Sequence, residues 1–113
     1  MPIEPVAISF TLEFKRNLRI LARKYRSIRS DLQPLIDQLQ AGDLPGDQVT
    51  GTGFAIFKVR MKNSDIQKGK RSGYRCTYYL QTRNNIILVT IYSKSEQSDI
   101  SSDQIRSILL EIG

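Results

Sequence analysis

The stretch Phe57–Arg75, FKVRMKNSDIQKGKRSGYR, predicts a strand, a basic loop and the start of a second strand, and the rest of this 113-residue chain is predicted to support it. Apolar and cationic residues alternate strictly over residues 57–62, FKVRMK. Because successive side chains of a β-strand point to opposite faces, this alternation predicts a strand with one face in the core and one cationic face. The three cations are Lys58, Arg60 and Lys62. Alternate residues of a strand lie roughly 6.6 Å apart, a spacing suited to the phosphates of an extended nucleic-acid strand.

A basic loop follows this strand. It contains Lys68, Lys70 and Arg71 beside two glycines, and Arg75 lies on the next predicted strand. Residues 58–75 include seven basic residues and one acidic residue. The resulting positive field attracts phosphate before any specific contact forms. The alternative interpretation, a solvated edge of a basic protein, fits the charge equally well.

Composition indicates a single domain spanning residues 1–113, because a chain of this length with 40% hydrophobic residues can bury a core of its own. The net charge of +6 and the pI near 9.7 favour an acidic partner: nucleic acid, an acidic protein or an anionic membrane. A membrane is the weakest of the three, because no apolar run approaches the roughly 20 residues that span a bilayer. The N-terminal segment also lacks the basic start and cleavage site of a signal peptide. We therefore expect a cytoplasmic protein.

Several kinds of catalytic site are excluded by the residues that the chain lacks. There is no histidine, and Cys76 is the single cysteine. The usual zinc-site spacings, an internal disulfide and nucleophilic pairs with histidine are therefore absent. Any catalysis must come from Lys, Arg, Tyr, Asp or Glu, and we expect no metal and no small-molecule cofactor. Cys76 is interpreted as a small buried hydrophobic residue.

The first half of the chain predicts an extended edge segment and two helices. Residues 2–10 read as the extended segment, with Ser9 or Thr11 as the cap of the first helix. Apolar residues recur every three or four positions over 14–28 and again over 32–39, which predicts an antiparallel helical hairpin. Ser30 or Asp31 is the predicted cap of the second helix. The first helix has a basic outer face, which is either solvated or grips RNA or an acidic partner.

The second half predicts strands and a final helix. Residues 43–54 read as a loop, followed by the basic strand. Residues 74–82 and 86–92 predict a hairpin whose second, more apolar strand is central. Ser101 and Gln104 fit a capping box for the last helix. The predicted order is strand, helix, helix, three strands, helix, which makes an α+β domain with a helical hairpin packed on a twisted antiparallel sheet.

These motifs resemble a known family. The element order, the FKVR strand, the KGKRSGYR segment, the tyrosine pair at 78–79 and ILVTIYSKSEQSDI over 87–100 are similar to the RelE/ParE toxin superfamily. Within it they look most like the RelE/HigB branch of type II toxin-antitoxin systems. The similarity extends over about residues 8–112 and is strongest after residue 55.

The resemblance implies a toxin that enters the ribosomal A site and cleaves mRNA, inhibiting translation. It also implies a cognate antitoxin that covers the basic concave face of the toxin. In the best-studied members of this family the ribose 2′-hydroxyl attacks the adjacent phosphorus without a metal. Such a site must remove the 2′ proton, stabilise a doubly charged transition state and protonate the leaving 5′ oxygen.

The resemblance also assigns catalytic residues. Lys58 and Arg60 align with a pair of cations on the family's first central strand, and Arg75 aligns with the arginine of the GYR motif. Lys58 is the better candidate for the base, because neighbouring cations disfavour its ammonium form. Arg60 and Arg75 keep their protons and are expected to supply fixed charge to the phosphate oxygens. Lys94 matches a basic position that assists the leaving group.

The general acid is left open at this point. The family's prototype has an arginine next to its equivalent of Lys94 and a tyrosine several residues later, where this chain has Ser95 and Ser101. Lys94 and Tyr92 are the candidates, with Glu96 behind them, and Tyr92 equally fits a core position.

Further RNA contacts are expected from the cations near the catalytic strands and from an aromatic ring that stacks on a base. The predicted residues are Lys62, Lys68, Lys70, Arg71 and Tyr74, with Phe54 as a second ring.

Two other functions are compatible with the sequence. One is a ParE-like inhibitor of gyrase that acts by binding protein, and the other is a non-toxic RNA-binding module.

Overall fold

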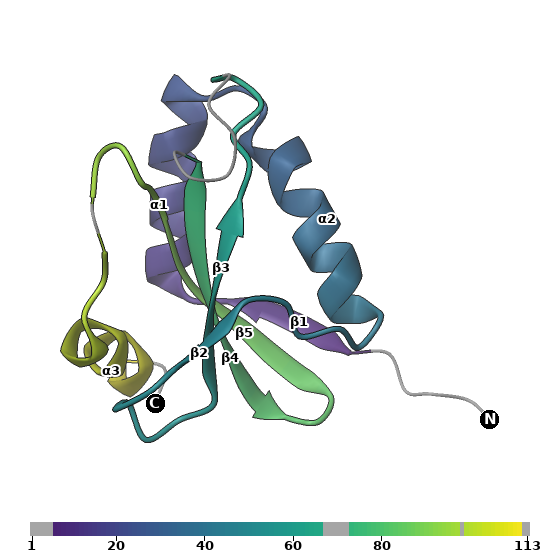
Figure 1. The fold of residues 1–113 in the computed structure, drawn as a ribbon, viewed down its shortest axis with the longest axis vertical. Helices are drawn as coiled ribbons and strands as arrows, with labels where there is room; N and C mark the ends of the chain where they lie inside the picture. Colours follow the sequence, from purple (N-terminus) through teal and green to yellow (C-terminus); the bar gives the residue numbers. More distant parts are fainter. Residues whose placement is uncertain (1–5, 67–72, 98, 112–113) are drawn as a thin grey trace.

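The computed structural model describes residues 6–66, 73–97 and 99–111, and its elements follow the predicted order with one addition (Figure 1). The elements are β1 (Ala7–Phe10), α1 (Leu12–Lys24), α2 (Ile28–Gln40), β2 (Asp47–Val49), β3 (Ile56–Met61), β4 (Tyr74–Thr82), β5 (Asn85–Ser93) and α3 (Ser102–Leu110). The added element is β2, a three-residue strand inside the segment predicted as a loop.

All five strands form one sheet in the order β1-β5-β4-β3-β2. The pairs β3–β4 and β4–β5 are antiparallel, as predicted, and the added strand β2 also pairs antiparallel with β3. The edge strand β1 pairs with β5 in parallel, so the sheet is mixed rather than purely antiparallel. The predicted central strand, β5, is an interior strand, and β4 occupies the middle of the sheet.

The helix ends show which predicted caps are used. The Thr11 hydroxyl accepts a hydrogen bond from Phe14 N at the start of α1, and Ser101 forms the predicted capping box with Gln104 at the start of α3. The prediction for α2 is wrong, because this helix begins at Ile28, before Ser30, with Ser27 as its N-cap. The backbone N–H of Ser27 has no partner within the helix and donates instead to the carboxylate of Asp65, 38 residues later in the sequence, at 2.9 Å.

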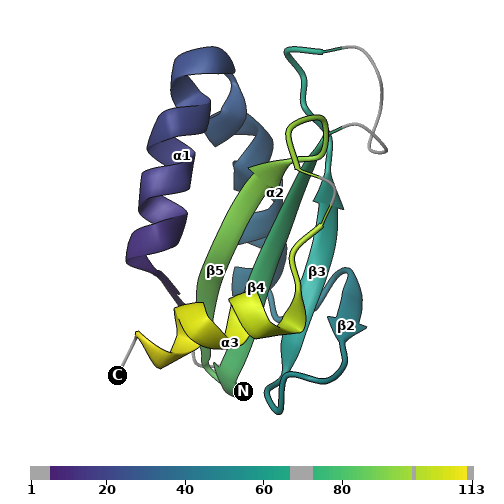
Figure 2. The same cartoon turned by 90° about the vertical axis from the view of Figure 1, so that its left-hand side faces the viewer.

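Helices cover the two faces of the sheet unequally (Figure 2). On one face α1 and α2 enclose the main core, which includes Leu21, Leu35, Met61, Cys76 and Tyr78. On the other face α3 packs across one end only, where Ile105, Ile108 and Leu109 join a smaller cluster from β3 and β5. None of the described helices covers the remaining end of this second face, and the cationic side of β3 lies there.

Candidate functional site

The strand register places three of the predicted catalytic residues in one row. Arg60 of β3 lies opposite Arg75 of β4, and Arg75 lies opposite Tyr92 of β5. Residues directly opposite each other in a sheet share a face, so these side chains point to the same side. Lys58 lies two residues before Arg60 on β3 and therefore faces the same way. The structure thus brings together Lys58, Arg60, Arg75 and Tyr92 on the face opposite α1 and α2.

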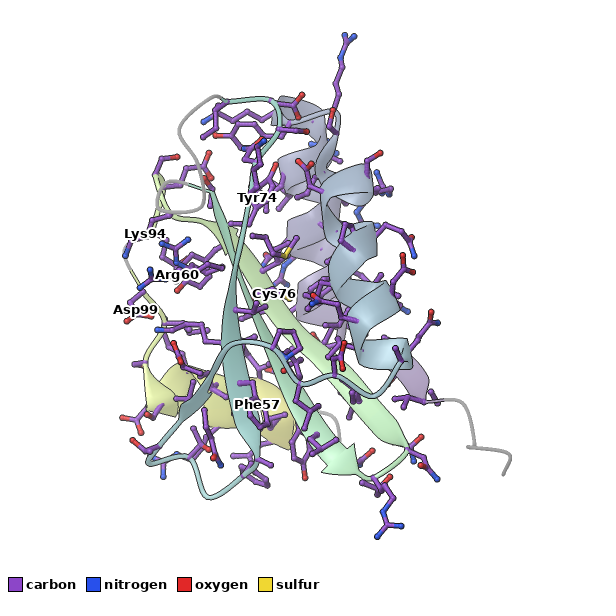
Figure 3. The ribbon with its side chains drawn as sticks, turned by 45° about the vertical axis from the view of Figure 1, so that its right-hand side comes forward. Phe57, Arg60, Tyr74, Cys76, Lys94 and Asp99 are labelled. Atoms are coloured by element: carbon purple, nitrogen blue, oxygen red, sulfur yellow. The ribbon has the colours of Figure 1, made fainter. Side chains whose placement is uncertain are left out.

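An acidic residue that the sequence reasoning missed closes this site. Asp99, in the segment between β5 and α3, accepts hydrogen bonds from Lys58 Nζ at 2.7 Å and from the Tyr92 hydroxyl at 3.1 Å. Figure 3 shows Asp99 beside Arg60 and Lys94, away from Cys76 on the helix side. The hydrogen bond from Lys58 lowers the pKa of the Asp99 carboxyl below its ordinary value. Asp99 is therefore ionised at neutral pH and forms an ion pair with Lys58.

Arg75 is a buried cation at the centre of the row. Its side chain is only 6% exposed, and its Nη1 donates to the Tyr74 carbonyl oxygen at 3.2 Å. Burial, followed by the nearby Arg60, lowers the pKa of Arg75 from its ordinary value. An arginine begins from a pKa above about 12 and keeps its proton at neutral pH. Arg75 therefore supplies fixed positive charge in a partly desolvated position.

The sequence left open whether Tyr92 is a general acid or a core residue, and its position is compatible with both. It is 6% exposed, as a core residue would be, and its hydroxyl donates to Asp99. Burial, with a smaller contribution from the Asp99 charge, raises the pKa of Tyr92 to about 12. The phenol is therefore protonated at neutral pH, and its proton points into the site.

The predicted stacking role of Tyr74 is wrong. Its ring is 0% exposed and packs edge-to-face on Tyr25 at 5.8 Å, inside the core beneath the helices. Neighbouring strand residues point to opposite faces, so a site that contains Arg75 excludes Tyr74. Phe54 is 39% exposed and packs on Tyr79 with ring centroids 5.5 Å apart.

The remaining predicted contacts lie around the row or outside the described residues. Lys62 is exposed just beyond the end of β3, and Lys94 is exposed in the turn after β5, where its N–H donates to the Gly73 carbonyl oxygen. Glu96 pairs with Lys24 at 2.7 Å, which ties this turn to the end of α1. The predictions for Lys68, Lys70 and Arg71 lie outside the described residues.

Cys76 is buried as predicted, and burial raises the pKa of its thiol. Over residues 6–66, 73–97 and 99–111, no group of three His, Cys, Asp or Glu side chains is arranged to hold a metal ion. None of the described helices is long and apolar enough to cross a membrane.

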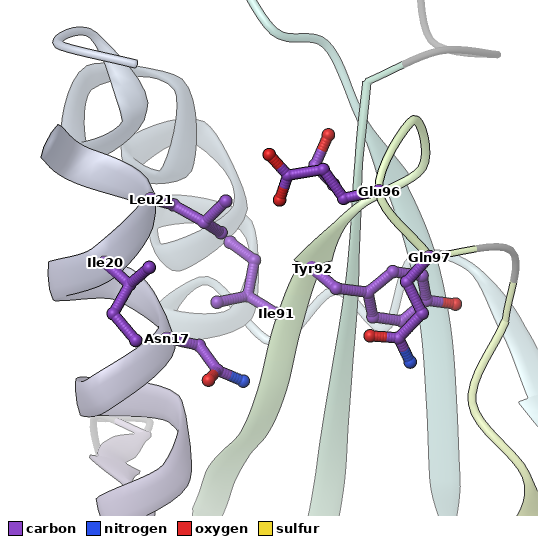
Figure 4. Close-up of a pocket in the computed structure, with 8 residues that line it drawn as sticks. Asn17, Ile20, Leu21, Ile91, Tyr92, Glu96 and Gln97 are labelled. Carbon is purple, nitrogen blue, oxygen red and sulfur yellow. The ribbon is translucent and has the colours of Figure 1, made fainter. Parts of the chain in front are cut away.

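A separate pocket of about 160 Å³ lies on the α1 side of Tyr92 (Figure 4). Its lining combines α1, the end of β5 and the following turn, and includes Asn17, Ile20, Glu96 and Gln97. Tyr92 also lines this pocket, whereas Lys58, Arg60 and Arg75 do not.

Comparison with known proteins supports the fold. No known family's sequence profile matches the chain. A solved structure of the E. coli toxin RelE, a double arginine-to-alanine mutant in the free state, matches with a TM-score of 0.57 over 96% of this chain and 97% of that chain. The chain has a RelE-like fold. At 13% sequence identity the likeness to RelE extends to the fold alone, and the assignment to the HigB-like branch stays a prediction.

Proposed function

We propose that this chain is the toxin of a type II toxin-antitoxin system, a ribosome-dependent endoribonuclease that cleaves mRNA without a metal and so inhibits translation. One observation carries the proposal. Cations from two neighbouring strands, Lys58, Arg60 and Arg75, share the open end of one sheet face with the protonated hydroxyl of Tyr92, in a chain with a RelE-like fold.

The proposed reaction is an attack of a ribose 2′ oxygen on the adjacent phosphorus. The bond from phosphorus to the 5′ oxygen breaks, and the products are a 2′,3′-cyclic phosphate and a free 5′-hydroxyl. Arg60 and Arg75 are placed to stabilise the negative charge that develops on the phosphate oxygens. Tyr92 is the proposed donor of a proton to the leaving 5′ oxygen, because its raised pKa keeps it protonated. Lys94 is the second candidate for this role.

Lys58 is the proposed base that removes the 2′ proton, and its contact with Asp99 opposes that role. In the free chain Lys58 Nζ donates to Asp99 Oδ1 at 2.7 Å, so it is engaged with a carboxylate rather than available to a 2′ hydroxyl. Lys58 can act as a base only when this contact is broken.

The direct test is to map mRNA ends on translating ribosomes with the wild-type chain and with Lys58→Ala and Arg75→Ala. We expect each change to reduce cleavage by at least about a hundredfold and to relieve growth arrest. Lys15→Ala removes an exposed cation of α1 and serves as the matched control. Full cleavage by both folded site variants contradicts the assignment of the site.

The proposed partners follow from the same surface. An antitoxin segment that covers the row must neutralise several cations, so we expect it to be acidic or amphipathic. mRNA in the ribosomal A site is the proposed substrate complex. Both partners are consistent with the cytoplasmic location that the sequence favours.

A second candidate is inhibition of gyrase by protein binding, as for ParE-like toxins. It is favoured by Ser101, which stands where the RelE prototype has a catalytic side chain and which here caps α3. A supercoiling assay with purified gyrase separates the two functions. Inhibition in that assay, with mRNA left intact on ribosomes, supports the second candidate. Salt-sensitive RNA binding without either activity corresponds to a non-toxic RNA-binding module.

A further inference from the structure

A single carboxylate oxygen collects three hydrogen-bond donors in the candidate site. Oδ1 of Asp99 accepts from Lys58 Nζ at 2.7 Å, from the backbone N–H of Ile100 at 2.8 Å and from the Tyr92 hydroxyl at 3.1 Å. An ammonium, a hydroxyl and a backbone amide are also the donors that proteins use for phosphate oxygens. The carboxylate of Asp99 therefore occupies a position that suits an oxyanion.

The surroundings of this position match a polyanion better than a single carboxylate. Tyr92 lies opposite Arg75 in the sheet, and Arg75 lies opposite Arg60, so two guanidinium groups adjoin the donors. Lys58, Arg60 and Arg75 carry three positive charges against the one negative charge of Asp99. A phosphodiester chain can engage several of these cations at once, which one side chain cannot do.

The carboxylate is also held weakly enough to be displaced. The Asp99 side chain is 59% exposed and that of Lys58 is 31% exposed, so water solvates both charges. Exposed ion pairs are weak for this reason. Gln97 Nε2 donates to the backbone oxygen of Asp99 at 2.9 Å, so the side chain can leave by rotating about Cα–Cβ while this backbone contact stays.

We propose that Lys58 and Tyr92 form an oxyanion-binding site that Asp99 fills in the free chain, and that a backbone phosphate of RNA takes this site by displacing Asp99. The proposal rests on the proposed ribonuclease function. It adds an intramolecular competitor to that site, because RNA must displace the Asp99 carboxylate from Lys58 and Tyr92 before its phosphate can bind there.

The test measures binding without cleavage. Fluorescence anisotropy at fixed ionic strength gives the Kd for a labelled 2′-deoxy oligonucleotide, which lacks the attacking hydroxyl. Asp99→Asn removes the competing charge, and repulsion between two charges a few ångströms apart in water corresponds to about fivefold in affinity. We therefore expect about fivefold tighter binding. Asp103→Asn makes the same charge change on an 84% exposed side chain of α3 and is the matched control; we expect less than about twofold there.

A second comparison identifies the site itself. In a Lys58→Met background, Asp99→Asn should increase the affinity for the oligonucleotide no more than Asp103→Asn does. The reason is that Lys58, the cation for which Asp99 and the phosphate compete, is then absent. Equal gains for the two aspartate variants in the wild-type background overturn the proposal, since net charge alone then explains the effect. Weaker binding by folded Asp99→Asn, checked by circular dichroism and thermal unfolding, also overturns it.

The outcome is separable from that of the proposed function. If the gain is specific to Asp99 but no mRNA is cleaved on ribosomes, the oxyanion site stands and the ribonuclease function fails. If mRNA is cleaved but the two aspartate variants bind alike, the ribonuclease function stands and the displacement of Asp99 fails.

Discussion

Tyr92 lies opposite Arg75 in the sheet, and its hydroxyl donates to Asp99. Removing this hydroxyl tests whether Tyr92 is the general acid. Tyr92→Phe keeps the buried ring and removes that proton. We expect single-turnover cleavage on ribosomes to fall by about 10²- to 10⁴-fold, with an unchanged fold. Tyr79→Phe, on the same sheet, is the control and should cleave normally. If Tyr92→Phe retains full activity, the general acid is another group, and Lys94 becomes the leading candidate.

The contact between Lys58 and Asp99 predicts a pH dependence of stability. The pKa of Asp99 is lower in the folded chain than in the unfolded chain, mainly because of the hydrogen bond from Lys58. Its stabilising contribution is therefore present above about pH 4 and is lost as the pH falls through the folded pKa. We expect Asp99→Asn to lower the free energy of unfolding at pH 7 by at most about 1 kcal/mol, since the pair is largely exposed.

Urea denaturation at pH 7 and pH 3 measures this contribution. The difference between the wild-type chain and Asp99→Asn should be smaller at pH 3 than at pH 7, because Asp99 takes up its proton as the pH falls through its lowered pKa. A difference of the same size at both pH values would show that Asp99 stabilises the fold by some means other than its charge.

The residue scale also shows what a sequence can reveal about a site. Alternation along β3 correctly placed Lys58 and Arg60 on one face, because strand periodicity is a local property. The same periodicity should have excluded Tyr74, the immediate neighbour of Arg75. Asp99 could not be placed from sequence, because its contact with Lys58 joins residues 41 positions apart across an irregular segment.

At the scale of elements, two glycines with the same backbone conformation test how β3 is held. Gly42 has φ +93° and Gly46 has φ +94°, a region that side-chain-bearing residues rarely adopt. A Cβ at Gly42 meets nothing within 4 Å, whereas a Cβ at Gly46 lies 2.4 Å from the backbone oxygen of Lys58. The connection between α2 and β2 therefore passes directly against the strand that carries the site.

We expect Gly42→Ala to destabilise the chain by about 1 kcal/mol, from backbone strain alone. Gly46→Ala should cost about 1–3 kcal/mol more, because the backbone at Lys58 must shift. Urea denaturation of both variants gives the two values. Because Gly42 and Gly46 have nearly the same φ, the backbone strain of the two alanine variants is similar and cancels in the comparison. Equal destabilisation would indicate that the segment between α2 and β2 moves away from β3 at no cost.

The elements that were mispredicted depend on distant partners. The start of α2 was placed too late because its N-terminal N–H is satisfied by Asp65, which lies 38 residues away. The short strand β2 exists through pairing with β3 rather than through a local pattern of its own. The parallel pairing of β1 likewise depends on where β5 lies in the assembled sheet. The starts of α1 and α3 have local caps and were predicted correctly, whereas the apolar period expected to continue to Ile28 is interrupted, because α1 ends at Lys24 and Ile28 begins α2.

At the scale of the whole molecule, which has a net charge of +6, the described residues include two basic surfaces. One is the exposed outer face of α1, which includes Lys15, Arg19 and Arg23. The other is the open sheet face with the site row, continued by Lys62 beyond β3. The main core lies between α1 and the sheet, so the two surfaces face different directions. A bound RNA strand can follow one of them but is not expected to follow both.

The salt dependence of RNA binding identifies the surface that is used. Each phosphate contact on single-stranded RNA contributes about 0.7 to the slope of log K against log salt. We expect Lys62→Ala to reduce the slope by about this amount and Lys15→Ala to leave it unchanged, although both remove one exposed cation. Titrations of one short RNA at several salt concentrations measure both slopes. The reverse result would place RNA on α1 and leave the Lys58, Arg60 and Arg75 row without its substrate.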